Sequence, residues 1–495
     1  MTTNAARGPH MPVAFQSLAM LKRSHSGSES APKNEPKAPL TPDGIVNLDL
    51  NMRISVESRR STSFLSIEPL QVDEGEPMPA PLGKTNEIPA AEDLKRDQYG
   101  FKKASLYVSE EDYNSWWEQY RHVLDRRRAK WYALLGKSGL SAASPTRFPS
   151  RGTKVRRYVR KGIPRQLRGA AWFFYAGGQN VLNKNRGVYE KLWRGSIDIR
   201  THDSELIERD LHRTFPDNVH FKPAKLRDTE PDLIQSLRRV LVAFAAYSPN
   251  IGYCQSLNFI AGLLLLFMDE ERTFWMLHII TQSYLPGMHF RNLEGVNVDQ
   301  AVLMTSVKEM LPNVWAVVGH PNVEPGDGGE YITRLPPVTL VTAAWFMSLF
   351  INALPIESVL RIWDCLFYEG TKVLFRVALT VFKLGEERIA AVRDPIEVLQ
   401  LVQTIPKLLI DAGALMHVCF QRHNGFGHIS QEQIDERRRL VAEKRERVRL
   451  DHEDGDGIYE ELLASMADTT MSSATLSLQN GYRKRRSGRR QGDGG

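Results

Sequence analysis

The sequence predicts an all-α protein, and three observations support this. Apolar residues recur at three- to four-residue spacing over long segments, as they do on amphipathic or buried helices. Proline and glycine interrupt these segments as they do at helix ends. Alternating patterns typical of strands are few. The expected central helices cover residues 233–247, 259–268, 272–284, 340–354 and 358–368.

The composition is that of a folded chain. Its 495 residues are 42% hydrophobic, enough for a sizeable core and two or three domains. The net charge of +7 permits anionic partners without selecting among them. Cys254, Cys365 and Cys419 lack the paired spacings of a zinc site or a disulfide framework, so we expect no metal and a reducing, cytoplasmic setting.

Residues 1–103 are expected to form a disordered arm, because Ser, Pro, Gly and charged residues dominate them and cannot bury enough apolar surface. Residues 104–161 are expected to be a helical lead-in and a basic linker. Ser109 precedes three acidic residues, as at a helix N-terminus, and aromatic residues then recur at helical spacing to about Leu135. The cations that start at Lys154 could grip phosphates, but a solvated or domain-joining face suits them better.

The packed domain is expected over residues 162–426. Its first helix should start at Pro164, and the Gly- and Pro-rich stretch at 322–334 should be an exposed loop. A solvated charged helix is expected over 427–452, with acids early and bases late, followed by a disordered basic tail over 453–495.

Other chemistries find little support. The Gly-Lys-Thr triplet at 83–85 lacks the first glycine of a phosphate-binding loop. Cys254 has no identifiable histidine and acid, so it is expected to be a core thiol. The most apolar run, 259–268, is half the ~20 residues of a membrane-spanning helix. We expect no spanning segment and only peripheral membrane association.

Arg213 follows Ile207 and Asp210 at three-residue spacing, so on a helix Asp210 can hold its side chain. Pro216 disfavours helical geometry at Phe215, which places Arg213 near an exposed helix end. In isolation, this pattern is usually a surface ion pair.

Gln255 follows Gly252, Tyr253 and Cys254, where a turn should enter a helix. Its amide should stand in or near the first turn of that helix. Alone, a polar cap would explain it. Together, an arginine and a glutamine suit phosphoryl transfer on a partner, because that chemistry needs positive charge and an oriented water more than covalent help.

At these residues the chain resembles the TBC domain, the Rab GTPase-activating module. The family's R-x-x-x-W, I-x-x-D-x-x-R and Y-x-Q motifs match Arg168 to Trp172, Ile207 to Arg213, and Tyr253 to Gln255. The resemblance covers roughly 162–426. The stretches GYCQSLNFIAGLLLLFM and LEGVNVDQ are similar to the fungal exocytic, cell-polarity type of Rab activator.

The resemblance implies a two-lobed helical domain that activates a GTP-bound Rab in trans, in vesicle traffic such as exocytosis or polarised growth. Arg213 would be the arginine finger, oriented by Asp210, and Gln255 the glutamine finger that replaces the Rab's own glutamine. Arg168 and Trp172 would belong either to the scaffold or to the edge of the partner-facing groove. Ser256 departs from the glycine that many members carry there.

The chain would need no cofactor of its own, because GTP and Mg²⁺ belong to the partner. No nucleic-acid partner is expected. Two other classes remain open: a helical adaptor that binds a GTPase or membrane complex without catalysis, and a lipid- or nucleic-acid-binding protein driven by the basic stretches near Arg156 and Arg485.

Overall fold

A computed structural model describes residues 95–141, 143, 145–222, 230–319 and 330–469, with side chains described to residue 450 except at 330 and 331. Every regular element in this part is helical, which confirms the all-α prediction. Its one strand-like contact is an isolated antiparallel bridge between Arg96 and Lys102. Residues 1–94 of the arm predicted over 1–103, and residues 470–495 of the tail predicted over 453–495, lie outside the described residues, whereas residues 95–103 are part of the described structure.

Two helices precede the main body. The first is α4 (Glu110–Lys137), whose N-terminus is capped by Ser109, as predicted. The second, α5 (Thr153–Lys161), occupies the stretch predicted to be a basic linker. That prediction missed its helicity: Val155 and Val159 are buried where α5 packs against α17, while the cations mostly face solvent. The basic face is therefore the outer side of a docked helix.

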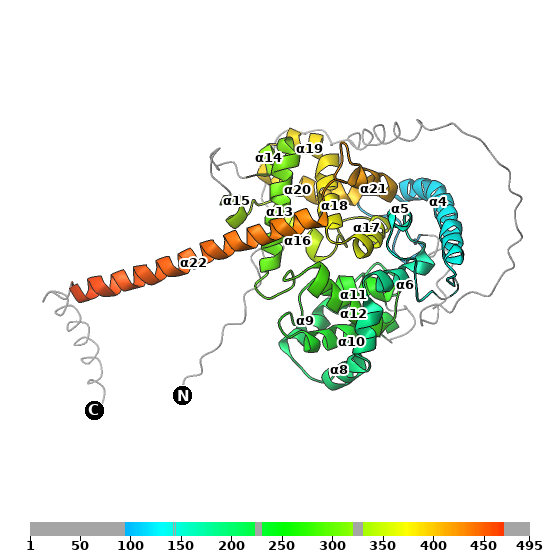
Figure 1. Cartoon of the computed structure of the whole chain (residues 1–495), viewed down its shortest axis with the longest axis horizontal. Coiled ribbons are helices and arrows are strands. Elements are labelled where there is room, and N and C mark those ends of the chain that lie inside the picture. The colour runs from blue at the N-terminus through cyan, green and yellow to red at the C-terminus, as the bar shows by residue number, and fades with distance from the viewer. Residues whose placement is uncertain (1–94, 142, 144, 223–229, 320–329, 470–495) are drawn as a thin grey trace, which may run out of the picture.

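The body consists of two lobes (Figure 1), which confirms the expected two-lobed architecture. In the first, α10 packs against α8, α9, α11 and α12. The elements of the first lobe are α6 (Arg165–Tyr175), α7 (Gly178–Lys184), α8 (Val188–Ser196), α9 (His202–Leu211), α10 (Asp232–Tyr247), α11 (Leu257–Leu265), α12 (Glu270–Ile279) and the π-helix η2 (Ile280–Tyr284).

In the second lobe, α18 packs against α17 and α21, and α17 also contacts α5 and α6, so that it joins the two lobes. Its elements are α13 (Glu294–Met310), α14 (Pro312–Val318), α15 (Glu330–Thr333), α16 (Thr339–Met347), α17 (Ile356–Glu369), α18 (Lys372–Leu384), α19 (Glu386–Ala391), α20 (Pro395–Thr404), the 3₁₀-helix η3 (Ile405–Leu408) and α21 (Ala412–Phe420). The loop predicted over 322–334 therefore contains one helical turn, and its residues up to 329 are not described.

The helix predicted over 340–354 ends early, at Met347. Leu349, Phe350 and Asn352 have positive φ angles of 51°, 66° and 61°, which an α-helix does not allow. Leu349 and Phe350 are both fully buried. Their burial therefore outweighs the local strain, a long-range effect that periodicity cannot reveal.

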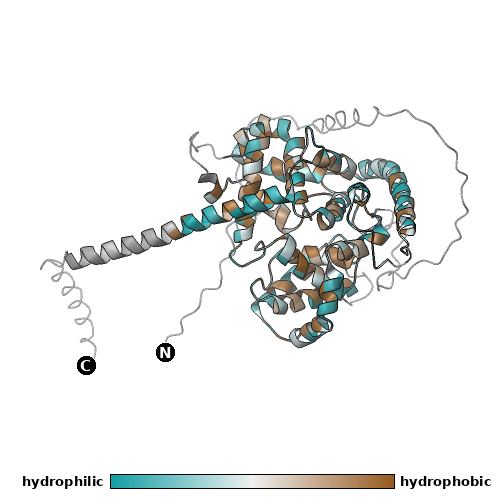
Figure 2. Cartoon of the chain, viewed as in Figure 1, coloured by the Kyte–Doolittle hydropathy of each residue, from teal (hydrophilic) through white to brown (hydrophobic). Residues whose placement is uncertain are grey.

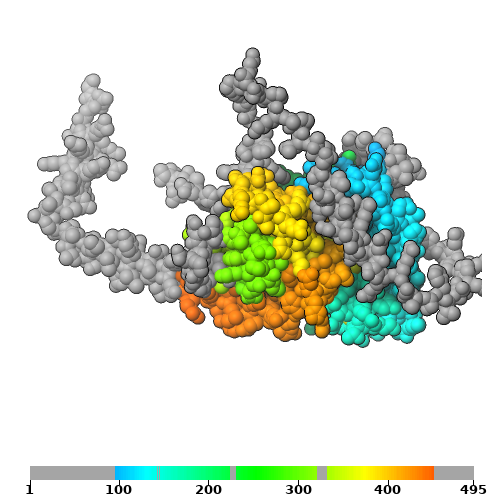
Figure 3. Space-filling model, turned by 90° about the horizontal axis from the view of Figure 1, so that it is seen from above, coloured from blue at the N-terminus to red at the C-terminus, as the bar shows by residue number. Residues whose placement is uncertain are grey.

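The last helix, α22 (Gln431–Thr469), begins on the body and projects away from it (Figure 1). It is longer than predicted, since residues 453–469 were assigned to the tail. Its first half is not simply solvated: Ile434 and Val441 are buried, and Arg438 makes a bidentate ion pair with Asp299 of α13, at 2.6 and 2.8 Å. Figure 3 shows this part of α22, in orange, lying along the body.

Apolar residues are concentrated in the helices of the body, whereas polar residues predominate on the described start of α22 (Figure 2). Among the described residues, no single helix is long and apolar enough to cross a bilayer; one pair bent by 110°, Pro395–Leu408 with Ala412–Phe420, passes only on combined length and composition. The apolar run at 259–268 lies mostly within α11 and belongs to the core.

Candidate functional site

Arg213 lies where the sequence predicted, just beyond a helix end. The helix α9 starts with a capping box in which Thr201 and Ser204 exchange side-chain-to-backbone hydrogen bonds. It ends at Leu211, and Thr214 Oγ1 donates to the carbonyl of Asp210 at 2.8 Å. The Arg213 side chain is 74% exposed, and its Nη1 lies 3.9 Å from Asp210 Oδ1. Asp210 thus attracts the guanidinium without a direct hydrogen bond.

Gln255 lies in the turn that enters α11, two residues before that helix begins. Its side chain is exposed, although Tyr253 and Ser256 beside it are buried. Within the described part of the chain, neither the Gln255 amide nor the Arg213 guanidinium makes a hydrogen bond. Both polar groups are therefore available to a partner molecule.

Two contacts tie the Arg213 and Gln255 segments together. Tyr253 donates a hydrogen bond from its hydroxyl to Asp210 Oδ2 at 2.8 Å. Behind it, Asn258 Nδ2 donates to Thr214 Oγ1 at 2.8 Å, and both residues are buried. Residues within three positions of Arg213 are thereby bonded to residues within three positions of Gln255.

The surroundings of the Tyr253 hydroxyl keep it protonated. Burial and the adjacent Asp210 carboxylate hold the pKa of Tyr253 far above its usual value, so its hydroxyl remains a donor. Burial also raises the pKa of the Cys254 thiol to about 12. The thiol is therefore protonated at neutral pH, which favours a structural role over a nucleophilic one. Cys254 is only partly buried and packs against the core rather than within it.

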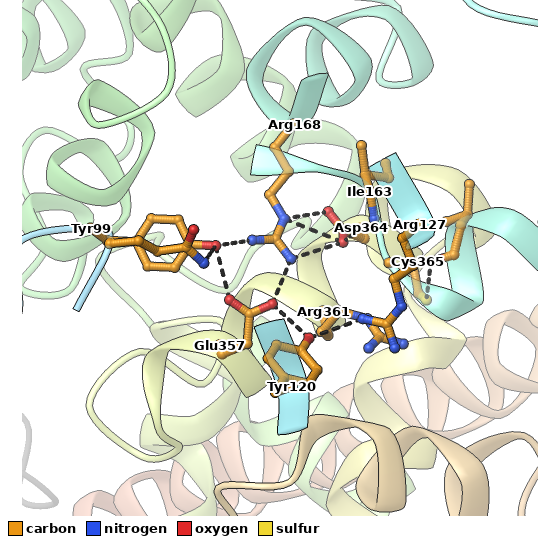
Figure 4. Close-up of polar contacts among 12 residues, drawn as sticks. Tyr99, Tyr120, Arg127, Ile163, Arg168, Glu357, Arg361, Asp364 and Cys365 are labelled. Carbon is orange, nitrogen blue, oxygen red and sulfur yellow. Dashed lines mark hydrogen bonds and ion pairs between the residues drawn. The ribbon is translucent and has the colours of Figure 1, made fainter. Parts of the chain in front are cut away.

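Arg168 and Trp172 lie elsewhere, inside the core between the two lobes. Figure 4 shows the Arg168 side chain with its polar partners. Arg168 is 1% exposed and contacts Glu357 at 3.0 Å and Asp364 at 3.3 Å, both on α17. Trp172 Nε1 donates to Asp364 Oδ1 at 2.9 Å. Of the two roles left open for this pair, the structure supports the scaffold and contradicts the partner-facing edge.

The buried charges compensate one another. Burial disfavours the charged form of Arg168, but the carboxylates of Asp364 and Glu357 outweigh it and raise the pKa of the guanidinium well above its usual value. Tyr99 and Tyr120 each donate to Glu357, at 2.9 Å. The network therefore joins α4 and the segment before it to α17 and α6.

Comparison with known proteins adds to this geometry. A family model described as the Rab-GTPase-TBC domain matches residues 165–390. The GTPase-activating protein MSB4 of Saccharomyces cerevisiae is 41% identical over 403 residues, which cover 71% of this chain and 82% of MSB4. The chain belongs to the Rab-GTPase-TBC domain family.

Other similarities agree with membership of the TBC family. The GTPase-activating protein GYP3 of Saccharomyces cerevisiae is 45% identical over 403 residues, which cover 70% of this chain and 64% of GYP3. The crystal structure of the Chlamydomonas flagellar RabGAP TBC domain is 26% identical with a TM-score of 0.51, and the alignment covers 66% of this chain and 99% of that one. The two-lobed helical fold is therefore that of a TBC domain.

Ser256 marks a strained point in this TBC domain. Its φ of 111° and ψ of −31° lie outside the regions that non-glycine residues favour. Its Oγ is buried without a hydrogen-bond partner in the described structure. The strained residue directly follows Gln255, at the position where many members of the family carry glycine.

Sequence reasoning missed the acids that hold Arg168 and the tyrosine that completes the network. Asp364 was part of a predicted helix, Glu357 lay between two predicted helices, and Tyr99 was assigned to a disordered arm. Tyr99 is 4% exposed and donates to Glu357, 258 positions further along the chain. The available signal was a pair of aromatic residues, Tyr99 and Phe101, near the end of the Ser- and Pro-rich arm.

Proposed function

We propose that this chain is a GTPase-activating protein for a Rab GTPase, and that Arg213 and Gln255 are inserted into the partner's nucleotide site. The observation that carries the proposal is the Tyr253–Asp210 hydrogen bond, which ties together two segments whose neighbouring exposed groups, a guanidinium and an amide, make no hydrogen bonds within the described chain. Family membership and the similarity to two yeast GTPase-activating proteins support the same activity.

The two side chains would divide the chemistry. Hydrolysis of GTP develops negative charge on the phosphoryl oxygens, which the Arg213 guanidinium would stabilise. The Gln255 amide can accept a hydrogen bond from the attacking water and donate one to a phosphoryl oxygen. GTP and Mg²⁺ come with the Rab, so this chain supplies charge and orientation alone.

A resemblance in sequence supports a cellular setting for this proposed activity. The stretches at 252–268 and 293–300 resemble those of Rab activators of exocytosis and polarised growth. Vesicle traffic of that kind would place the chain in the cytoplasm, in peripheral contact with the membranes that carry its GTP-bound Rab. The adaptor alternative differs in one measurable respect, since it binds the Rab without changing phosphate release.

Single-turnover phosphate release from a panel of GTP-loaded Rabs tests the proposal. An arginine finger contributes about 10³–10⁵ in rate, roughly 4–7 kcal/mol, so Arg213→Ala should lose almost all stimulation. Because the side chain is exposed, the fold should be unchanged. Arg209→Ala removes another exposed arginine of the same region and is the matched control. Equal stimulation by wild type and Arg213→Ala would refute the assignment.

Gln255→Ala should also lower the stimulated rate, by roughly 100-fold, because the water loses its alignment. Gln179→Ala, on the exposed surface of α7, is its control. A Rab whose own catalytic glutamine is replaced by leucine should still respond to the unaltered chain. If that Rab fails to respond while Gln255→Ala stays active, the Rab's glutamine orients the water and Gln255 does not.

A further inference from the structure

A short segment upstream of the region matched by the family model forms a self-braced turn. Lys103 donates from its backbone to the Lys95 carbonyl at 3.0 Å. Asp97 Oδ1 accepts from the backbone nitrogens of Tyr99 and Phe101, at 2.8 and 2.9 Å. We call residues 95–103 the N-terminal turn.

Backbone carbonyls of the N-terminal turn accept hydrogen bonds from the loop that carries Arg213. Asn218, which is fully buried, donates from its side chain to the Tyr99 carbonyl at 3.0 Å. Val219 donates from its backbone to the Gly100 carbonyl at 3.1 Å. A Cβ at Gly100, where φ is +88°, would lie 2.8 Å from Val219 Cγ1. Contact this close leaves no room for a side chain.

Side chains of the N-terminal turn reach the same loop. Arg96 Nη1 donates to the Asp217 carbonyl at 2.7 Å, and Lys102 pairs with the Asp217 carboxylate. The Phe101 ring packs edge-on against Phe215, with centroids 5.2 Å apart. Phe215 is two residues from Arg213, within the same loop over 212–222, which we call the finger loop.

The finger loop needs such support because its backbone is strained. Phe215 has a φ of +49°, which is unfavourable for a bulky residue and persists only where the surroundings fix it. The other side of the N-terminal turn is anchored, since Tyr99 contacts both Glu357 and Arg168. A continuous set of contacts thus runs from the interlobe core to Phe215.

We infer that the N-terminal turn is a positioning element for Arg213, which fixes the loop that presents the guanidinium. This rests on the proposed function and extends it to residues outside the family match. Loss of the turn should act mainly on the stimulated maximal rate, because a displaced finger fails in the transition state while Rab binding persists.

The test uses the full chain with Arg96→Ala and Phe101→Ala, and Phe101→Leu as the conservative variant. Arg121→Ala, an exposed arginine on α4, is the control. The maximal stimulated rate should fall by about 10- to 100-fold for Phe101→Ala, with little change in KM and partial recovery in Phe101→Leu. Hydrogen exchange of the amides at 213–221 should become faster in Arg96→Ala and Phe101→Ala.

Unchanged exchange, or faster exchange with an unchanged rate, would overturn the inference. So would a loss confined to KM, or one matched by Arg121→Ala. The proposed function has its own test: it is refuted if Arg213→Ala stimulates a Rab as well as wild type does. If wild type stimulates no Rab at all, both proposals are refuted. Wild-type activity that depends on Arg213 but not on Phe101 or Arg96 would remove this inference alone.

Discussion

Tyr253 donates a 2.8 Å hydrogen bond to Asp210, and so connects the turn of Gln255 with the helix end of Arg213. The carboxylate is the shared part, since its other oxygen lies 3.9 Å from the Arg213 guanidinium. The Asp210 side chain, which is only 13% exposed, thus contacts both segments. Together with the Asn258–Thr214 contact, the Tyr253 hydroxyl therefore helps to set the geometry of both proposed fingers.

Tyr253→Phe should lower the stimulated hydrolysis rate roughly tenfold, because a hydrogen bond to a charged group is worth about 1.5–3 kcal/mol. The ring and its packing remain, so binding of the Rab should change little. Tyr247→Phe removes a hydroxyl that has no hydrogen bond among the described residues, and should leave the rate unchanged. A single-turnover assay compares the two, and equal rates would show that the hydroxyl has no role.

Ser256→Gly should stabilise the protein by about 1 kcal/mol while keeping its activity. Glycine removes the strain of a φ of 111°, which costs about 1–3 kcal/mol, and returns part of that gain as backbone entropy. Ser256→Ala removes the unpaired Oγ but keeps the strain. Urea unfolding distinguishes the two: if alanine stabilises as much as glycine, the hydroxyl rather than the backbone is the source.

Asp364→Ala should destabilise the fold by about 3–5 kcal/mol, because it leaves the buried Arg168 guanidinium without one of its carboxylates. Glu118→Ala breaks the exposed pair with Arg121 and should cost less than about 1 kcal/mol. Denaturant unfolding at neutral pH measures both. Similar losses would mean that the interlobe network carries little of the stability.

Acid should destabilise the protein partly through His289, which is 1% exposed with Nε2 3.0 Å from the Met347 carbonyl. Burial lowers its pKa to about 4, below the ordinary 6.5. As the pH falls, this histidine therefore binds a proton in the unfolded chain before it does so in the folded one. The free energy of unfolding has its full value above about pH 6.5 and falls by up to about 3 kcal/mol as the pH drops toward 4. His289→Gln should flatten this fall in unfolding experiments at pH 7.5 and 5; an unchanged fall would assign it to other groups.

Helices with strong local signals were predictable from the sequence. Ser109 and the acidic residues after it marked the start of α4, and Pro164 that of α6. Arg213 and Gln255 were selected as candidates because short motifs carry them, and both side chains are exposed, as expected. These features depend on neighbours within a few positions, which a pattern can register.

Features set by distant contacts were not predictable. The N-terminal turn has no helical periodicity, and its order comes from partners such as Glu357, 258 positions away from Tyr99. The ion pair between Arg168 and Asp364 spans 196 positions, so Asp364 looked like any helix residue. Leu349 and Phe350 adopt non-helical backbone angles because that conformation buries their side chains. In each case tertiary packing overrode the local preference.

The interlobe network and the ion pair between α22 and α13 together limit how far this chain can be shortened. A fragment trimmed to 165–390 would lose Tyr99 from Glu357 and Arg438 from Asp299, leaving two core acids short of donors. It would also expose the apolar surfaces of the body against which α4 and the start of α22 pack. A self-sufficient fragment should therefore begin no later than Lys95 and extend past Val441, well beyond the family boundaries on both sides.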